Sequence, residues 1–403
     1  MPVQIITFGC RLNAYESAAI QEMSGLPDNI VIVNTCAVTG EAERQCRQMI
    51  RKLRREHPDA YLVVTGCAAQ VHPELYAQMP EVDRVLGNRE KLNADNFTPE
   101  KPAVLAAGLD TPVDFKAPEP VFFDGRCRAF IQIQQGCNNH CTFCIVPQAR
   151  GKSVYLPAQK ILNHARKLVD RGYAEINLTG VEITDYPDFA KLVEALTKIN
   201  GLKRLRLGSL DPACIRDDLI SLFGRSDILQ PHVHLSAQSG DNIILKRMAR
   251  RHTREDILTL CQKLRAARPD IVFGADFITG FPTETDEMFR NTIDLTETAG
   301  LTHLHVFPYS VRPGTPAAKM PQIPVPVRKE RAKILRDAGE RLLFEYMRGR
   351  IGQTAVVLYE TDQKGLCEHY LNVHVAGRFK AGEFIPVRLT GIKQTGIFEG
   401  SVL

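Results

Sequence analysis

The feature that most constrains the fold is a regular alternation of short apolar runs with polar stretches of helical periodicity. Three apolar runs open the chain, namely Val3–Phe8, Ile30–Asn34 and Tyr61–Thr65. They recur at roughly the thirty-residue period of βαβ units. Residues 1–88 are therefore predicted to form a doubly wound parallel α/β domain. Residues 89–126 show little periodicity and predict a linker with several prolines, which are Pro99, Pro102, Pro112, Pro118 and Pro120.

The same alternation resumes in residues 127–326 and repeats six times. Parallel strands with covering helices, in this number, predict an incomplete (β/α)6 barrel in a chain of overall α/β class. The strand candidates are Phe130–Gln134, Glu175–Thr179, Arg204–Ser209, His232–Ala237, Val272–Ile278 and His303–Tyr309. Residues 327–351 predict one connecting amphipathic helix. Residues 352–403 predict a small antiparallel β-barrel with strands at Ala355–Tyr359, Tyr370–Val375 and Phe384–Leu389.

Composition narrows the class of protein further. The 403 residues are 44% hydrophobic and 24% charged, which is typical of a globular protein with several domains. No apolar run is long enough to span a membrane, and no signal peptide is expected. Eleven cysteines, an odd number, favour reduced thiols or metal ligands in a cytoplasmic protein over a disulfide framework. The net charge of +5 permits a nucleic-acid partner without requiring one.

One loop carries three thiols with the spacing C-x3-C-x2-C, at Cys137, Cys141 and Cys144. A [4Fe–4S] cluster held by three cysteines leaves one iron open to bind a further ligand. The amino and carboxylate end of S-adenosylmethionine would suit that position, and an electron from the cluster could then break a carbon–sulfur bond to give a radical. The alternative is a zinc knuckle completed by His140. Structural zinc usually uses paired two-cysteine arms, so the spacing favours the cluster.

A second group of thiols follows the three N-terminal apolar runs. Cys10, Cys36 and Cys67 each stand at the end of one run. Because the carboxyl ends of neighbouring parallel strands share one edge of a sheet, these thiols are predicted to converge there. Gly9 and Gly66 would let the backbone approach a bound group closely. The three could instead be buried small hydrophobic residues, but their common register favours a second cluster with an open iron.

The remaining five cysteines show no comparable pattern and are predicted to be packing or surface thiols. They are Cys46, Cys127, Cys214, Cys261 and Cys367.

With both groups of thiols in view, the chain resembles the radical S-adenosylmethionine methylthiotransferases over nearly its whole length. The matching stretches are Gly9–Asn13, Asn34–Cys36, Thr65–Cys67, Gly136–Arg150, His234–Gly240, Asp276–Glu284 and Phe307–Thr315. The tail is similar to the small RNA-binding β-barrel, called TRAM, that ends these enzymes. Its stretch Gly365–Tyr370 departs from the usual small-polar pattern of that module.

The resemblance implies two [4Fe–4S] clusters and two molecules of S-adenosylmethionine. One molecule would methylate a sulfur held at Cys10, Cys36 and Cys67. The other would yield the radical that activates an unactivated carbon–hydrogen bond, which ordinary acid–base groups cannot reach. The implied partners are a tRNA anticodon stem-loop, an electron donor of the flavodoxin or ferredoxin type, and a sulfur source, with no membrane.

Three substrate branches exist within the resemblance. The stretches Asn34–Thr39 and Val85–Lys91 are most similar to the branch that acts on N6-threonylcarbamoyladenosine at tRNA position 37. The alternatives are isopentenyladenosine in tRNA and an aspartate of a ribosomal protein. An alternative of another class is a metal-cluster RNA-binding protein without turnover.

Residues that follow the strands of a (β/α) barrel line its active mouth. By position and by the family pattern, several are expected to contact S-adenosylmethionine, with loop stabilisation as the equally weighted alternative. They are Phe143, Gly180, Glu182, Ser209, Gln238, Ser239, Gly280 and Arg312. Arg312 could instead contact an RNA phosphate. Four alternating histidines are predicted to be interior or packing residues, and these are His232, His234, His303 and His305.

Basic residues predict where RNA would bind. One face of a predicted helix carries four arginines, which are Arg44, Arg47, Arg51 and Arg54. A row of positive charges without acidic residues modestly favours contact with phosphate. A second basic group follows the fourth barrel strand, at Lys246, Arg247, Arg250, Arg251 and Arg254.

Overall fold

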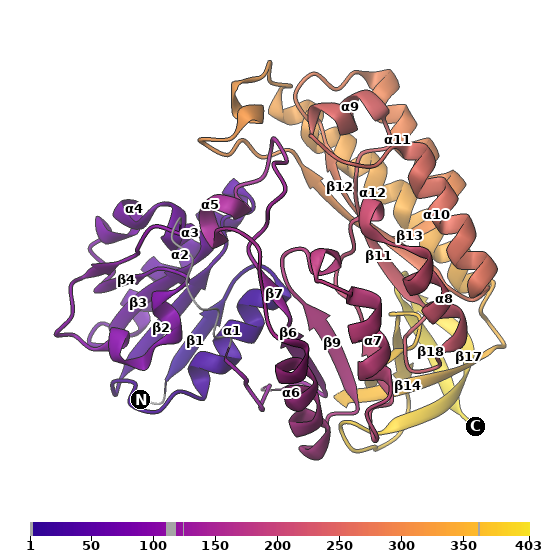
Figure 1. Cartoon of the computed structure of the whole chain (residues 1–403), viewed down its shortest axis with the longest axis horizontal. Helices are drawn as coiled ribbons and strands as arrows, with labels where there is room; N and C mark the ends of the chain where they lie inside the picture. The colour runs from indigo at the N-terminus through magenta and orange to yellow at the C-terminus, as the bar shows by residue number, and fades with distance from the viewer. Residues whose placement is uncertain (1–2, 110–117, 124, 362) are drawn as a thin grey trace.

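A computed structural model describes residues 3–109, 118–123, 125–361 and 363–403 of the chain. They form three bodies (Figure 1): an N-terminal α/β unit, a central set of parallel strands covered by helices, and a small C-terminal barrel. Among the described residues, no helix is both long and apolar enough to cross a membrane.

The N-terminal unit is built on five parallel strands that lie side by side in chain order. The strands are β1 (Gln4–Thr7), β2 (Ile30–Thr35), β3 (Tyr61–Gly66), β4 (Arg84–Leu86) and β5 (Val104–Leu105). The helices between them are α1 (Arg11–Gln21), α2 (Gly40–Glu56), α3 (Cys67–Val71) and α4 (Pro73–Ala77).

Helices cover both faces of this sheet, as the doubly wound prediction requires. Successive side chains of a strand point to opposite faces. Val31 and Val33 of β2 belong to the same buried cluster as Ile50 of α2. Ile30 lies on the other face, in a cluster with Ile20 of α1. Because both faces are buried, the strands read as continuous apolar runs in the sequence.

The predicted linker over residues 89–126 is only partly a linker. Two 3₁₀ turns, η1 (Glu90–Leu92) and η2 (Ala94–Phe97), lead into β5, which pairs with β4 as the last strand of the sheet. Phe97 is fully buried in the cluster under the sheet and anchors this segment. A strand of two residues is too short for hydrophobic periodicity to reveal. Pro112 lies outside the described residues.

The central body confirms the predicted incomplete barrel. Its six parallel strands form two sheets of three, β10-β9-β6 and β11-β12-β13, which parallel bridges at Leu205–Leu229 and Leu210–Leu235 join. The strands are β6 (Arg128–Gln132), β9 (Glu175–Thr179), β10 (Arg204–Arg206), β11 (His232–Gln238), β12 (Val272–Thr279) and β13 (Leu301–Pro308). The helices are α6 (Ala158–Asp170), α7 (Phe189–Thr197), α8 (Asp217–Arg225), α9 (Asn242–Arg247), α10 (Arg254–Ala267) and α11 (Asp286–Ala299).

Alternation along the central strands makes the outer face apolar and the concave face polar. Leu235 and Ala275 belong to the large core shared with the covering helices. The residues between such positions meet one another across the strands on the concave face, which we call the lumen. The lumen includes His232, His234, Asp276, His303 and His305. His232 and His234 are buried, as the sequence predicts, whereas His305 is largely exposed.

The chain ends in helix α12 (Val325–Arg348) and a closed five-stranded barrel of order β14-β15-β16-β18-β17. Its strands are β14 (Thr354–Thr361), β15 (Lys364–Cys367), β16 (Asn372–Val375), β17 (Phe384–Gln394) and β18 (Ile397–Val402). The prediction of a wholly antiparallel barrel needs one correction, because β16 and β18 pair in parallel. Directions cannot alternate around a closed ring with an odd number of strands, so one pair must be parallel.

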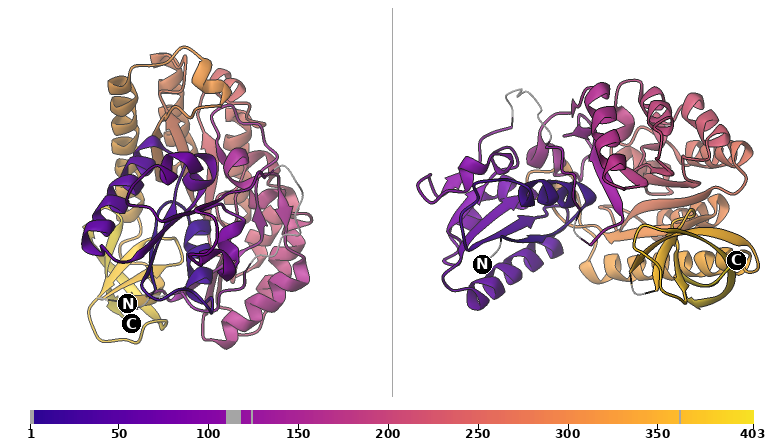
Figure 2. Two further views of the ribbon diagram at one scale, coloured as in Figure 1. Left: turned by 90° about the vertical axis from the view of Figure 1, so that its left-hand side faces the viewer. Right: turned by 90° about the horizontal axis from the view of Figure 1, so that it is seen from below.

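The C-terminal barrel docks on the amino ends of the central strands through the turn between β15 and β16 (Figure 2). Tyr370 stacks on His232, with ring centroids 4.7 Å apart and an angle of 17° between the rings. Arg206 lies over the Tyr370 ring and donates to the carbonyl of Cys367 at 2.7 Å. Arg11 of the N-terminal unit donates to the Tyr370 hydroxyl. The unusual stretch Gly365–Tyr370 is therefore where all three bodies meet.

Loss of this aromatic contact is expected to loosen the C-terminal barrel. For Tyr370→Ala we predict that proteolysis between α12 and β14, at Gly349–Gln353, accelerates about tenfold, because stacking and cation–π contacts are lost. Phe344→Ala provides the control, since Phe344 is 42% exposed on α12. Equal cleavage rates in the two variants, measured by mass spectrometry of the released fragment, would contradict the docking role of Tyr370.

Candidate active site

The structure places Cys10, Cys36 and Cys67, which we call the N-terminal thiols, at one edge of the N-terminal sheet. Cys10 follows β1 as the N-cap residue of α1, Cys36 follows β2, and Cys67 begins α3 directly after β3. Because β1, β2 and β3 are adjacent and parallel, their carboxyl ends meet. The edge position that the sequence suggests is therefore the observed one.

Glycines allow this close arrangement. Gly9 has φ +92, and a Cβ on it would lie 2.9 Å from Sγ of Cys36. Gly66 has φ +97, and a Cβ on it would collide with the carbonyl of Thr35. Both positions combine a left-handed backbone with no room for a side chain, so only glycine fits.

The N-terminal thiols have donors around them and repel one another when ionised. The Val38 amide donates to Cys36 Sγ at 3.5 Å, and Arg150 Nε donates to Cys67 Sγ at 3.3 Å. Burial raises the pKa of Cys36 to about 12, with further increases from the charges of Cys67 and Cys10. Three thiolates at one edge, with Cys36 and Cys67 buried and Cys10 exposed, need a cation between them, and soft thiolates suit iron–sulfur clusters and zinc.

A buried ionic network lies next to the N-terminal thiols and contacts them through Arg150. Arg150 binds the Glu16 carboxylate at 2.8 Å and Lys91 binds it at 2.6 Å. Arg150 also donates to Asn13 Oδ1 at 2.6 Å. Burial alone would raise the pKa of Glu16, but Arg150 and Lys91 lower it to about 2. The network carries two cations and one anion, so it presents excess positive charge to the thiols.

The loop thiols, Cys137, Cys141 and Cys144, lie on a tightly folded segment that follows β6 and the short strand β7 (Gln134–Gln135). The Asn139 amide donates to Cys137 Sγ at 3.4 Å, and the Val146 amide donates to Cys144 Sγ at 3.4 Å. Burial raises the pKa of Cys137 to about 11 and that of Cys144 to about 12.

Further contacts fix the path of this loop. Gly136 has φ +74, and a Cβ there would collide with the carbonyl of Lys152, which lies just before the short strand β8 (Val154–Tyr155). Arg250 Nη1 donates to Cys141 Sγ at 3.7 Å and Arg250 Nη2 donates to the Ser236 carbonyl at 2.8 Å. A loop with three thiols, each accepting one N–H from its surroundings, suits three-point ligation of a cluster better than a closed four-ligand zinc site.

Helix α5 (Val146–Arg150) joins the two groups of thiols. It begins two residues after Cys144 and ends at Arg150, the residue that contacts Cys67. Ile145 and Ala149 are buried in the apolar core of the N-terminal unit together with Cys67. The segment between Cys144 and Arg150 is therefore shared by both groups, and neither can shift without the other.

Three of the other predicted contact residues lie beside the loop thiols. Phe143 packs edge-on against Phe281, with ring centroids 6.5 Å apart. Glu182 is buried next to Thr184, and burial raises its pKa to about 7. A Cβ on Gly180 would lie 2.9 Å from the Gln134 carbonyl, so this position also needs glycine.

Two further predicted residues lie at the carboxyl end of the central strands. Gln238 ends β11 with φ +67, a conformation uncommon outside glycine. Ser209 Oγ donates to Asp276 Oδ2 at 3.3 Å, so Ser209 belongs to the lumen.

Three predicted contact residues have structural partners instead. Ser239 is fully buried and accepts from the Asp241 amide at 3.2 Å. Gly280 packs on Arg328 of α12, where a Cβ would lie 2.5 Å from Cγ. Arg312 is 3% exposed and bound to Glu43 of α2, which removes it from RNA contact. Loop residues next to a barrel mouth satisfy their own backbones as often as they bind ligands, and sequence position alone does not separate the two.

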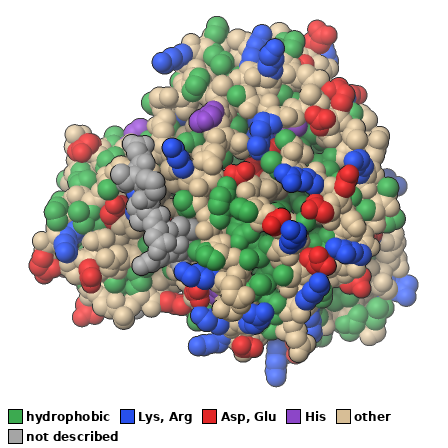
Figure 3. Space-filling view, in the orientation of Figure 1, with side chains coloured by type: hydrophobic (Ala, Val, Ile, Leu, Met, Phe, Trp, Pro, Cys, Tyr) green, Lys and Arg blue, Asp and Glu red, His purple; other side chains and the backbone are tan. Residues whose placement is uncertain are grey.

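Both predicted basic groups are largely neutralised. Arg54 donates to the carbonyls of Glu81 and Ala60 and pairs with Asp83, and Arg44 pairs with Glu41. In the second group, Arg250 and Arg251 pair with Asp211 and Arg254 pairs with Asp294. On the face in Figure 3, lysine and arginine side chains are interspersed with aspartate and glutamate. Apart from Glu41, which is three residues from Arg44, the acidic partners are distant in sequence, so the charge pattern overstated the free positive charge.

Sequence reasoning missed the residues that support the thiols, namely Glu16, Lys91, Arg150, Asp211 and Arg250. One signal existed, because Arg150 ends the same stretch, Gly136–Arg150, that carries the loop thiols. The others are single charged residues, and although Glu16 is only six residues from Cys10, nothing in the sequence marks them as partners of the thiols.

Comparison with known families defines the class of protein. A model described as "Radical SAM superfamily" matches residues 131–296, and one described as "Uncharacterized protein family UPF0004" matches residues 2–87. The solved structure of TsrM, a radical S-adenosylmethionine methyltransferase from Kitasatospora setae, is similar in fold. It has a TM-score of 0.53 and 17% identity, and the match covers 76% of this chain and 69% of that one. This protein is a radical S-adenosylmethionine enzyme.

Relatives of known name identify the family. The threonylcarbamoyladenosine tRNA methylthiotransferase MtaB of Rickettsia prowazekii is 46% identical, over 97% of this chain and 95% of the relative. The enzyme of the same name from Bacillus subtilis is 35% identical, over 96% and 92%. A tRNA-2-methylthio-N(6)-dimethylallyladenosine synthase from Ruegeria pomeroyi is 35% identical, over 96% and 95%. The chain belongs to the radical S-adenosylmethionine tRNA methylthiotransferase family.

The buried network predicts an acid-sensitive fold. The pKa of Glu16 is lowered from 4.5 to about 2. Its contribution to stability is therefore present above pH 4.5 and is lost as the pH falls toward 2. Glu16→Gln is expected to destabilise the protein by about 3–5 kcal/mol at neutral pH, because two buried cations lose their counter-ion.

Thermal unfolding between pH 3 and pH 7 checks this prediction, with ~pH 3 chosen to lie inside the titration window. The stability difference between wild type and Glu16→Gln should shrink toward the acid end. The exposed Glu100→Gln serves as the control and should follow the wild-type profile. A constant difference across the range would show that Glu16 does not act through its charge.

Proposed function

We propose that this protein converts N6-threonylcarbamoyladenosine at position 37 of tRNA into its 2-methylthio derivative. The observation that carries the proposal is the pair of three-thiol groups joined through Cys144–Arg150. One reaction needs a radical source and a sulfur donor close together, and the shared segment supports that arrangement. The named relatives support the same substrate, since the relative of 46% identity carries this activity in its name.

In this proposal each group of thiols holds one [4Fe–4S] cluster. The loop thiols, Cys137, Cys141 and Cys144, bind one cluster, and the N-terminal thiols, Cys10, Cys36 and Cys67, bind the other. When bound with S-adenosylmethionine, the clusters supply one-electron cleavage of the sulfonium and a methylated sulfur for transfer.

The chain's own residues hold and orient these groups. Arg250 fixes Cys141 against β11 through its second contact with the Ser236 carbonyl. Arg150 stabilises the anionic form of Cys67 by a charge-assisted hydrogen bond. Phe143 and Phe281 pack beside the loop thiols and keep water from that side.

The proposal extends to partners and location. Reductive cleavage of S-adenosylmethionine needs an electron, so a donor of the flavodoxin or ferredoxin type completes the system, and each transferred sulfur must be replaced from a sulfur source. The anticodon stem-loop of tRNA is the macromolecular substrate. Because this substrate is found in the cytoplasm, the proposal makes the protein cytoplasmic.

Two matched variants separate the roles of the two thiol groups. Cys141→Ala is expected to abolish release of 5′-deoxyadenosine, because the loop thiols would no longer hold their cluster. Cys36→Ala should retain 5′-deoxyadenosine release and lose methylthio transfer. Each variant should contain about four iron atoms, against about eight in the wild type. A wild-type iron content near four would mean that the N-terminal thiols hold no cluster.

Nucleoside mass spectrometry tests the substrate. In tRNA from a strain that lacks the gene, we expect the 2-methylthio form of threonylcarbamoyladenosine to disappear and the unmethylthiolated form to accumulate. The gene for the wild type should restore it, and the gene for Cys36→Ala should not. Loss of the isopentenyladenosine derivative alone would assign the protein to the other tRNA branch.

A further inference from the structure

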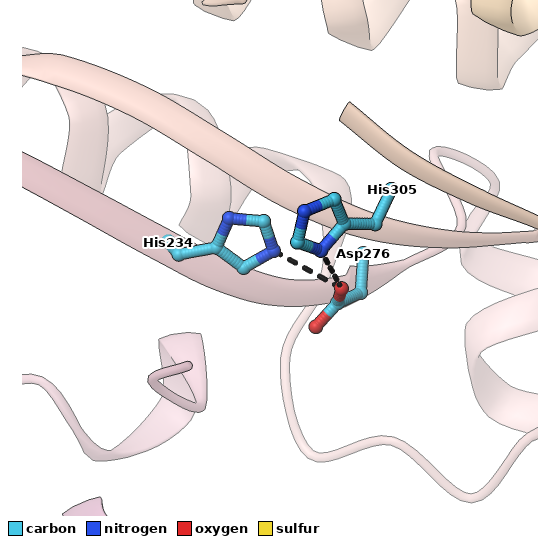
Figure 4. Close-up of side chains that lie close together, drawn as sticks. All are labelled: His234, Asp276 and His305. Atoms are coloured by element: carbon cyan, nitrogen blue, oxygen red, sulfur yellow. Dashed lines mark hydrogen bonds and ion pairs between the residues drawn. The ribbon is translucent and has the colours of Figure 1, made fainter. Parts of the chain in front are cut away.

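The lumen contains a compact group of two imidazoles and one carboxylate on three neighbouring strands (Figure 4). His234 of β11 lies with Nε2 3.0 Å from Asp276 Oδ1, and His305 of β13 lies with Nδ1 3.1 Å from the same oxygen. The two imidazole ring centroids are 4.5 Å apart. Ser209 donates to the second carboxylate oxygen at 3.3 Å. Both oxygens of Asp276 are therefore engaged.

Gly274 shows that this arrangement depends on the local backbone. It is the register partner of His234 on the adjacent strand β12. A Cβ at position 274 would collide with Nδ1 of His234. Glycine at this point lets the imidazole lie over β12 and reach Asp276, two residues further along the strand.

Arg250 ties the strand that carries His234 to the loop thiols. Arg250 links Cys141 to the carbonyl of Ser236 on β11, and His234 is two residues earlier on that strand. At the rise of a β-strand, two residues correspond to roughly 7 Å. A ligand that reacts near Cys141 and extends down the lumen by the length of a nucleoside substituent would thus reach His234 and His305.

Among the described residues in this part of the lumen, the unpartnered polar atoms belong to the imidazoles and not to the Asp276 carboxylate. The His305 side chain is 59% exposed, and its Nε2 has no hydrogen-bond partner among the residues that the structure describes. His232, only 8% exposed, has a buried Nε2 that is likewise unpartnered within the described part of the chain. Because Nδ1 of His305 faces the Asp276 carboxylate, Nε2 of His305 donates to a bound group when both ring nitrogens carry a proton. Nε2 of His232 donates in one tautomer of the neutral ring.

The surroundings of this group are polar and charged. Arg204 and Arg206 lie at the bottom of the lumen and pair with Glu175, at 3.5 Å and 2.9 Å, and Arg204 also lies 3.8 Å from the Glu368 carboxylate. His232 and His303 stand between them and Asp276, with their rings 5.2 Å apart. An apolar substituent placed here would strip water from these groups and give no hydrogen bond in return, which is unfavourable.

We propose that His305, positioned by Asp276 and flanked by His234, binds the carboxylate of the threonylcarbamoyl group and thereby selects this nucleoside over one with an apolar N6 substituent. The inference rests on the proposed function and names the part of the site that recognises the substrate. Threonylcarbamoyl carries a carboxylate and a hydroxyl, whereas an isopentenyl group carries neither. Asp276 is a positioning residue, because its contacts are with the two imidazoles and Ser209.

The same three side chains also suit a divalent metal ion, since their ligand atoms lie within 4.8 Å of one another. Binding of a polar substituent fits the geometry better, because a metal ion held by these three atoms would not use Nε2 of His305 or Nε2 of His232. A bound metal ion at this position is one possible result of the experiment below.

The test uses the full-length, cluster-reconstituted protein and anticodon stem-loops that differ only at position 37. Fluorescence anisotropy measures Kd for loops with threonylcarbamoyladenosine, isopentenyladenosine and unmodified adenosine. The variants are His305→Gln, Asp276→Asn and, as the control, His57→Gln. His57 lies in the turn after α2, at the amino edge of the N-terminal sheet and away from the lumen.

The wild type is expected to bind the threonylcarbamoyl loop more tightly than the unmodified loop. In His305→Gln and Asp276→Asn this preference should fall about tenfold through weaker binding of the threonylcarbamoyl loop alone, because a charge-assisted hydrogen bond is lost. His57→Gln should keep the wild-type preference. A protein damaged in general would instead lose affinity for all three loops.

Three results would overturn the inference. The first is an unchanged preference in both lumen variants, in a wild type that does form the methylthio product; the proposed function would then survive. The second is one equivalent of a metal other than iron in the wild type, absent from His305→Gln by elemental analysis. The third is a wild type that does not methylthiolate threonylcarbamoyladenosine, and in that case the proposed function fails as well.

Discussion

The constraint on which the rest of the structure depends is the short segment from Cys144 to Arg150. It is a continuation of the loop that carries three thiols, yet its apolar residues are buried in the core of a different body. Its last residue neutralises Glu16 and contacts Cys67, both fully enclosed in the N-terminal unit. A buried arginine without a partner would destabilise the protein. The partners of Arg150 therefore fix where the two bodies contact each other, as well as which residues they bury.

The three bodies also contact one another at other points. The N-terminal unit contacts the central strands through α5 and through the Arg312–Glu43 pair, and its Arg11 reaches the C-terminal barrel at Tyr370. The lumen is thereby closed at its amino end by the C-terminal barrel and bordered at its carboxyl end by the loop thiols. In the proposed function, a substrate base would enter this chamber with the loop thiols at one end and the lumen histidines further down. That division suits an enzyme that must place an unreactive carbon accurately while reading a substituent some distance away.

Much of this organisation was predictable from the sequence, and the exceptions have physical causes. Apolar runs buried on both faces identify the strands of parallel sheets, so all nine predicted parallel strands are present. The register of Cys10, Cys36 and Cys67 with the strand ends located the N-terminal thiols. Short strands such as β5 and β15 carry too few residues for periodicity to detect. Partners such as Glu16 with Arg150 are separated by more than a hundred residues, and single charged residues carry no signal of what they will face once folded.

The central claim is that two groups of three thiols hold two clusters on one shared segment. Six residue steps from Cys144 to Arg150, largely helical, place the two groups on the order of 10 Å apart. Electron paramagnetic resonance of the protein with both clusters reduced tests this most directly. The account predicts a spectrum broadened by magnetic coupling between the clusters, different from the sum of the spectra of the two single-cluster variants Cys36→Ala and Cys141→Ala. A spectrum equal to that sum, or the signal of a single cluster, would contradict it.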